Sequence, residues 1–270
     1  MLELYRSPQR SRVHNVCIPA TRNRDWVRGL WSYSYVVEST DISRLVGVLI
    51  RNEMRFDLLR LELIEGSWKV GKRSEICRVE RSNDAELPYT SVCCSGERVL
   101  CTVEDTYRVF AFQHYELDPV GDFRFDTQLS HMTAPESPSG PLVAISFRDD
   151  FIQLYRHDQV DATGKKIFEL HELVRVHCDN VHAILAVRDR LLVAERLEDE
   201  ERDIIWSCSL IDDSLLLEGE VTMEHQIGVQ CWRTSIDGQY IAAVGKGSQE
   251  LLVLTCEPLL LIIRELSYVI

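Results

Sequence analysis

The chain has 270 residues, 45% hydrophobic and 27% charged, so it can bury a sizeable core and has the balance of a globular protein. Its net charge of -13 at pH 7 excludes a general nucleic-acid-binding function, because phosphate backbones bind basic surfaces. The longest apolar run, Pro258–Ile263, is too short to span a membrane. We therefore expect no nucleic-acid and no membrane partner.

The cysteines and the N-terminus indicate the compartment in which the protein works. There are nine cysteines, an odd number, and the sequence has neither an Asn-x-Ser/Thr acceptor site nor the apolar core of a secretory signal. Such a chain is typical of a reducing environment. We expect an intracellular protein, cytoplasmic or nuclear.

The first 28 residues form a basic arm. They carry six arginines against only Glu3 and Asp25, which gives +4 there and leaves -17 for the rest of the chain. This arm could dock on an acidic partner, dock on the acidic body of the same chain, or remain a solvated tail.

A short apolar sequence recurs five times along the chain. The copies are SRLVGVLI at Ser43, ERVLCTVE at Glu97, GPLVAISF at Gly140, DRLLVAER at Asp189 and GQYIAAVG at Gly238. Their starts are 54, 43, 49 and 49 residues apart, and each copy is followed by a polar gap and a second apolar run. In the third copy, Leu142–Phe147 and Phe151–Tyr155 flank Arg148-Asp149-Asp150, a pattern that predicts a β-hairpin.

Further strands are expected between these copies. Alternation of apolar and polar residues predicts a half-buried strand around Leu59–Leu63, whereas unalternated runs such as LVAISF predict strands covered on both faces. The Lys166–Val176 segment fits either a strand or a helix. The other expected strands are Trp31–Val37, Trp68–Cys77, Tyr107–Phe112, a segment near Phe123 and Phe125, Ile204–Leu210, Leu215–Leu217, Leu251–Thr255, Pro258–Ile263 and Leu266–Ile270.

Several short strands per repeat, at this spacing, are the pattern of β-propeller blades. Over roughly residues 31–265 the chain resembles a divergent WD40-like β-propeller. The WD40 signatures Gly-His and Trp-Asp are missing, and the corresponding strand ends read Tyr155-Arg156, Leu210-Ile211 and Thr255-Cys256. A fainter similarity is to the propeller-like C-terminal regions of fungal F-box proteins.

The resemblance implies an all-β fold of four-stranded blades, with at least five recognisable repeats. It also implies a division of the chain into two parts. Residues 31–270 would form the propeller, and residues 1–30 would be the basic N-terminal arm or part of the closing blade.

Two segments contain residue types that bind metals or phosphates. His177-Cys178-Asp179-Asn180-Val181-His182 is the densest group of metal-ligand types, but its two histidines point to opposite faces of a strand. Val244–Ser248 has the Gly-Lys of a phosphate-binding loop but lacks the first glycine of that motif, so a turn between two strands explains it better. We expect no metal, no cofactor and no catalytic residue at these positions.

Glu195–Asp203 contains six acids and two arginines in nine residues. Such a run is usually a solvated loop, and its functional alternative is a docking site for a basic segment. The residues predicted to bind a protein partner are Glu198, Asp199, Glu200, Glu201, Arg22, Arg24 and Trp26.

From this pattern we expect a non-catalytic protein-interaction module, such as a scaffold or a ubiquitin-ligase substrate-receptor-like subunit. The expectation depends on the loops that a propeller presents around a rigid body. The alternative is a propeller enzyme, a hydrolase with its site in the central channel.

Overall fold

We describe the fold from a computed structural model of the chain. It describes residues 2–4, 14–16, 35–37, 44–50, 55–65, 67–78, 90–103, 106–114, 116–148, 150–160, 166–197, 202–211, 214–222, 229–234, 240–245, 250–255 and 261–267. The elements in these residues are β-strands, joined into antiparallel sheets. Among the described residues, no helix has the length and apolar character that a membrane crossing needs. The chain divides into two compact units, residues 1–101 with 110–121 and residues 102–109 with 122–270.

The first unit contains a two-stranded and a four-stranded sheet. The small sheet pairs β1 (Leu2–Leu4) with β2 (His14–Val16). The larger sheet has its strands in chain order, β3 (Tyr35–Val37), β4 (Arg44–Ile50), β5 (Arg55–Ile64) and β6 (Ser67–Arg78). The N-terminal segment, predicted to be a basic arm or part of the closing blade, therefore contributes a strand pair.

The boundary between the units runs through the next four-stranded sheet. Its strands are β7 (Thr90–Ser95), β8 (Arg98–Val103), β9 (Arg108–Gln113) and β10 (Pro119–Arg124). All six residues of β8, an inner strand, are buried, whereas β10 at one edge of the sheet is largely exposed. This gradient explains why β8 lacks polar alternation.

The second unit contains three further four-stranded sheets and one short hairpin. The first of these sheets consists of β11 (Leu129–Thr133), β12 (Leu142–Phe147), β13 (Phe151–Arg156) and β16 (His171–His177). The second consists of β17 (Val181–Val187), β18 (Arg190–Leu197), β19 (Arg202–Ile211) and β20 (Ser214–Thr222). The third consists of β21 (Val229–Thr234), β22 (Tyr240–Gly245), β23 (Glu250–Thr255) and β24 (Leu261–Ser267).

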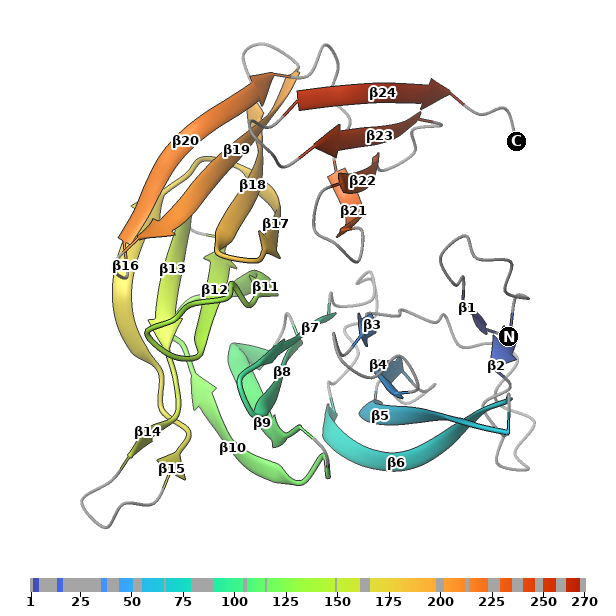
Figure 1. Ribbon diagram of the computed structural model, residues 1–270. Helices are drawn as coiled ribbons and strands as arrows, with labels where there is room; N and C mark the ends of the chain where they lie inside the picture. Colours follow the sequence, from blue (N-terminus) through green and yellow to red (C-terminus); the bar gives the residue numbers. More distant parts are fainter. Residues whose placement is uncertain are drawn as a thin grey trace, which may run out of the picture. The chain divides into compact units, whose positions relative to one another are not determined.

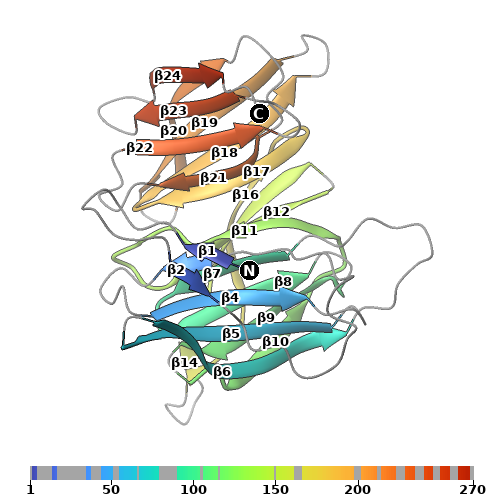
Figure 2. The ribbon, with the colours of Figure 1, turned by 90° about the vertical axis from the view of Figure 1, so that its right-hand side faces the viewer.

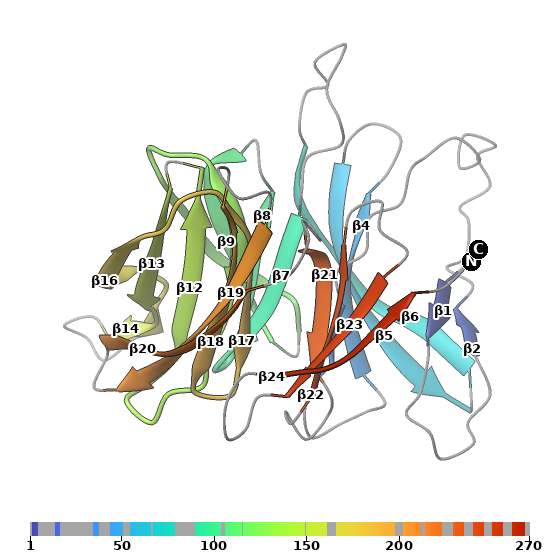
Figure 3. The same ribbon diagram turned by 90° about the horizontal axis from the view of Figure 1, so that it is seen from above.

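The views in Figures 2 and 3 follow these sheets strand by strand. Figure 2 shows β21 to β24 side by side, and Figure 3 shows β12, β13 and β16 side by side. The hairpin of β14 (Gln159–Val160) and β15 (Lys166–Ile167) leaves the β11–β16 sheet and extends away from it (Figure 1).

The five sequence copies occupy equivalent places in the fold, because each supplies the second strand of a four-stranded sheet: β4, β8, β12, β18 and β22. No two of them pair with each other. The prediction of equivalent strands is confirmed, with one correction. Another strand precedes each copy at the edge of its sheet, and four of these first strands, β7, β11, β17 and β21, were not predicted.

The core of the second unit lies within and between these sheets. Val143, Ile145, Leu192 and Ile241 are at most 1% exposed, as their apolar runs predict. One cluster joins Leu142, Ile152 and Leu154 of the β11–β16 sheet to Ile184, Leu191 and Val193 of the next sheet. The two sheets therefore share a continuous apolar interior, which holds their facing strands in place.

Candidate functional site

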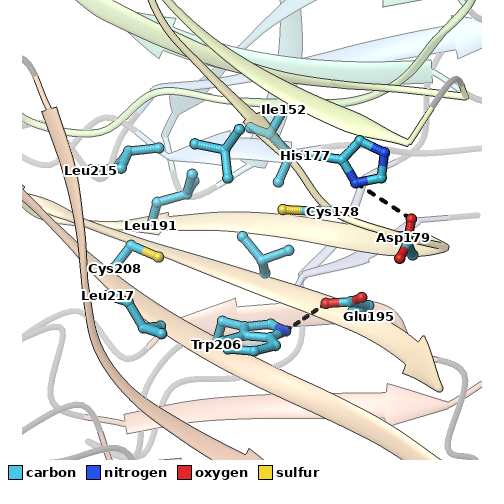
Figure 4. A pocket seen from close by; sticks show the side chains of 12 residues that line it. Ile152, His177, Cys178, Asp179, Leu191, Glu195, Trp206, Cys208, Leu215 and Leu217 are labelled. Atoms are coloured by element: carbon cyan, nitrogen blue, oxygen red, sulfur yellow. Dashed lines mark hydrogen bonds and ion pairs between the residues drawn. The ribbon is translucent and has the colours of Figure 1, made fainter.

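A pocket of about 290 Å³ lies where the β11–β16 sheet meets the β17–β20 sheet, within the second unit (Figure 4). This volume is at the lower end of the range of small-molecule sites. The residues that line it come from five strands and one turn: Ile152, Val176, His177, Cys178, Asp179, Leu191, Val193, Glu195, Trp206, Cys208, Leu215 and Leu217.

The apolar walls are built from residues that pair across neighbouring strands. Val193 on β18 lies opposite Trp206 on β19. Leu191 lies opposite Cys208, and Cys208 lies opposite Leu217 on β20. Because paired residues share a face of the sheet, one face of β18 to β20 presents a continuous apolar surface to the pocket. Ile152 and Val176, another cross-strand pair, complete it from the other sheet.

The polar end of the pocket is formed by the turn that joins β16 to β17. The Asp150 turn of the predicted hairpin holds this segment, since its backbone oxygen accepts a hydrogen bond from the Cys178 N–H at 3.0 Å. Its Oδ1 also accepts from the Asn180 N–H at 3.1 Å. Asp150 and Asn180 both adopt positive φ, a conformation that Asp and Asn tolerate better than most residues. The two hydrogen bonds to Asp150 thereby hold the turn residues from Cys178 to Asn180 in place.

His177 and Asp179 pair at this end, with 3.4 Å between Nδ1 and Oδ1, and the pair is ionic when the imidazole is protonated. Their side chains are 75% and 68% exposed, so the pair faces solvent. Figure 4 places it beside Glu195 and away from Leu215 and Leu217. The pocket therefore has an open polar end and an apolar interior.

Glu195 is the buried acid of the site. It is 9% exposed, and its Oε2 accepts a hydrogen bond from the Trp206 Nε1–H at 2.7 Å. Burial raises the pKa of the Glu195 carboxyl above its usual value, and the Asp179 charge adds to this effect. The Trp206 N–H, the Asp179 backbone N–H and the His177 charge act in the opposite direction. A carboxyl in this environment can hold a proton and deliver it to a bound molecule.

The two thiols of the pocket are protonated at neutral pH. Burial raises the pKa of Cys178 to about 12, with further contributions from Glu195 and Cys208. Burial also raises the pKa of Cys208. Because the thiolate is the reactive form of cysteine, these side chains line the pocket as small apolar groups rather than as nucleophiles.

The predicted partner-binding residues lie outside the described part of the chain: Glu198, Asp199, Glu200, Glu201, Arg22, Arg24 and Trp26. The two ends of the acidic run are described, and they correct the loop interpretation. Glu195 and Asp203 are strand residues, 9% and 0% exposed, because β18 and β19 stay paired as far as Leu197 and Arg202. Asp203 lies 3.7 Å from the Arg196 guanidinium.

The segment rejected as a metal site contains three residues of the pocket, His177, Cys178 and Asp179. The described residues contain no group of three or more His, Cys, Asp or Glu placed to hold a metal ion. Sequence reasoning missed the pocket itself, although one signal was present: Glu195 directly extends the apolar run Leu191–Ala194.

Comparisons with known proteins establish the fold class. No family model and no curated protein matches the chain. Among solved structures, it is similar to the periplasmic gluconolactonase PpgL of Pseudomonas aeruginosa, with a TM-score of 0.54, 13% identity and coverage of 86% of this chain and 69% of that one. A Bacteroides fragilis protein described as a candidate 6-phosphogluconolactonase matches with a TM-score of 0.54, 12% identity and coverage of 87% and 80%. The β-propeller domain of Cps50 (Swd1) from Myceliophteria thermophila matches with a TM-score of 0.52, 13% identity and coverage of 89% and 87%.

The chain is a β-propeller. The WD40-like resemblance is supported at the level of this fold, and the comparisons give no support to the similarity with F-box proteins. The prediction that the chain is not an enzyme is contradicted, because two of these propellers are described as lactonases.

Proposed function

We propose that this propeller is a hydrolase that cleaves a small ester or lactone in the pocket between the β11–β16 and β17–β20 sheets. The observation that carries the proposal is the Glu195 carboxyl, buried with a raised pKa at the polar end of the pocket, next to the His177–Asp179 pair. Two propellers of similar fold are described as lactonases, which supports the same class of reaction.

The two protonatable groups would act on opposite sides of the scissile bond. His177, held by the Asp179 carboxylate at its Nδ1, takes a proton from water through Nε2, and the water oxygen bonds to the carbonyl carbon. The carbon–oxygen single bond then breaks, and Glu195 gives its proton to the leaving alkoxide. The products are a carboxylic acid and an alcohol, and solvent returns the proton from His177 to Glu195.

The apolar surroundings of Glu195 assist this division of roles. A buried carboxyl whose pKa is raised above its usual value can serve as the acid, whereas the His177 side chain faces solvent, from which the attacking water comes. Trp206 holds the carboxyl in one orientation through its Nε1–H. Trp206 on β19 thus positions the Glu195 carboxyl, and Asp179 in the turn after β16 positions the His177 imidazole.

The test is hydrolysis of a panel of neutral lactones and esters by the purified chain, followed by pH-stat. Glu195→Gln and His177→Asn should each lower kcat by about 10²- to 10⁴-fold. Glu169→Gln, an exposed acid that does not line the pocket, is the control and should keep full activity. Absence of hydrolysis across the panel, or full activity of the Glu195→Gln variant, would overturn the proposal.

Binding of a basic protein segment remains a second proposal, at Glu198, Asp199, Glu200 and Glu201. These four acids join the paired ends of β18 and β19, and their charge complements the arginines of the first 28 residues. The same hairpin carries Glu195, so a bound partner would lie on an element of the pocket.

A further inference from the structure

We propose that the pocket selects an uncharged substrate with an alkyl body, which lies against β18 to β20 with its carbonyl group at the Glu195 end, and that it discriminates against hydroxylated or phosphorylated sugar lactones. This inference deepens the proposed function, since it names the substrate class of the same site. The binding preference can be tested without hydrolysis.

The walls of the pocket have few partners for sugar hydroxyl groups. Seven of the twelve lining residues are aliphatic or tryptophan, and two more are cysteines that stay protonated. A hydroxyl buried against such walls loses its hydrogen bonds to water without replacement. Alkyl groups, in contrast, gain from leaving water. The lining therefore favours an alkyl chain over a polyol.

The charges at the polar end are unfavourable for a phosphate. The lining residues include two acids, Asp179 and Glu195, and the described lining contains no lysine or arginine. The one cationic candidate, His177, is already paired with Asp179. A phosphate in this place would meet two carboxyl groups without the guanidinium or ammonium partners that phosphate sites use.

Strand β20 supplies a matched pair of positions for the test. Leu217 lines the pocket and is 51% exposed, whereas its neighbour Leu216 is 55% exposed and does not line it. Neighbours on a strand point to opposite faces, so the two leucines have similar exposure but different surroundings. An aspartate at either position adds the same charge with a similar effect on folding.

The experiment measures binding with lactams, in which an amide resists hydrolysis. Isothermal titration should show that the δ-lactam analogue of δ-decalactone binds, while gluconolactam and its 6-phosphate bind at least about tenfold more weakly. Leu217→Asp should weaken the alkyl lactam by about tenfold or more, and Leu216→Asp should leave its Kd within about twofold. Circular dichroism and Tm confirm that both variants fold.

The outcomes separate the two proposals. If the alkyl lactam binds as expected but the lactone is not cleaved, the substrate class stands and the hydrolase proposal fails. If lactones are cleaved but the sugar lactams bind as tightly as the alkyl lactam, the hydrolase proposal stands and the substrate class fails. Equal effects of the two aspartate substitutions, or binding of none of the lactams, would also overturn the substrate class.

Discussion

Two buried acids, Asp57 on β5 and Glu195 on β18, differ in what surrounds them. Asp57 is 0% exposed, and its Oδ1 lies 2.8 Å from the Arg55 Nε while its Oδ2 lies 3.7 Å from the Arg73 Nε. Glu195 is 9% exposed and accepts a hydrogen bond from Trp206, but no lysine or arginine of the described residues forms an ion pair with it. Both side chains are buried, but only Asp57 has guanidinium groups beside it among the described residues.

The difference separates a structural carboxylate from one available for chemistry. Two guanidinium groups stabilise the ionised form of Asp57, so its charge is part of what holds β5 and β6 together. Glu195 has no guanidinium partner among the described residues, and burial raises the pKa of its carboxyl above the usual value. A buried acid without a cation is costly for stability at neutral pH, and such groups concentrate at functional sites.

The largest expected effect is at Asp57. Replacing Asp57 by alanine removes the anion shared by Arg55 and Arg73, of which Arg55 keeps Glu75 at 2.9 Å, and should lower the free energy of unfolding by about 3 kcal/mol. Chemical denaturation measures the change. Asp122→Ala is the control, because Asp122 pairs with Arg108 at 3.3 Å with both side chains 42% exposed, and should cost about 1 kcal/mol or less. Equal losses in the two variants would remove the distinction between the buried pair and the surface pair.

A smaller effect, of opposite sign, is expected at Glu195. Burial raises the pKa of Glu195 in the folded protein above its value in the unfolded chain. At a pH below the unfolded-state pKa, the carboxyl is protonated in both the folded and the unfolded state, so burying it costs no stability through ionisation. As the pH rises to neutral, the unfolded state releases its proton first and stability is lost. Glu195→Gln imitates the protonated form and keeps an acceptor for Trp206. Its Tm should exceed that of the wild type at pH 7 to 8, and the gain should vanish near pH 4.

The Glu169→Gln variant, which changes an exposed acid, provides the comparison for this measurement. A Tm for Glu195→Gln that is lower than wild type at every pH would show that the ionised carboxylate is stabilised, as it is at Asp57.

The smallest effects concern the third group of acids, Glu198, Asp199, Glu200 and Glu201. Replacing all four with glutamine or serine should weaken binding of a labelled peptide with the sequence of residues 1–28, at about 0–1 kcal/mol for each exposed pair. The wild-type interaction should also weaken towards physiological salt, where the Debye length is about 8 Å. Arg22→Ser with Arg24→Ser in the peptide tests the basic side. Unchanged binding at low salt would leave these residues as solvated surface.

Among the strands that sequence reasoning found, those with buried, unalternated residues are the most readily recognised. All six residues of β12 are buried, and the run LVAISF therefore predicts it without help from its neighbours. The first strand of each sheet is harder to recognise, because it contains polar side chains that form hydrogen bonds with a neighbouring sheet. Thr133 on β11, for example, accepts a hydrogen bond from the Ala186 N–H of β17 at 2.9 Å. Its sequence, LSHMT, carries no period that indicates this role.

The pocket could not be predicted for a related reason. Its lining residues run from Ile152 to Leu217 and meet only because two sheets pack together. His177 and Asp179 attract attention as ligand types, yet their partner Glu195 lies in a different hairpin. Strand register, rather than sequence spacing, places Val193 opposite Trp206 and so brings the Trp206 N–H to Glu195.

The Asp150 turn gives the site a dependence on a residue that never touches the pocket. Two hydrogen bonds from the turn after β16 end on this one residue, one on its backbone oxygen and one on its carboxylate. Hairpin turns are usually the segments in which sequence drift and insertions are tolerated. Here a change in the length of the turn would displace the segment from Cys178 to Asn180. We therefore expect selection on ligand binding in the neighbouring pocket to limit insertions and deletions in this loop.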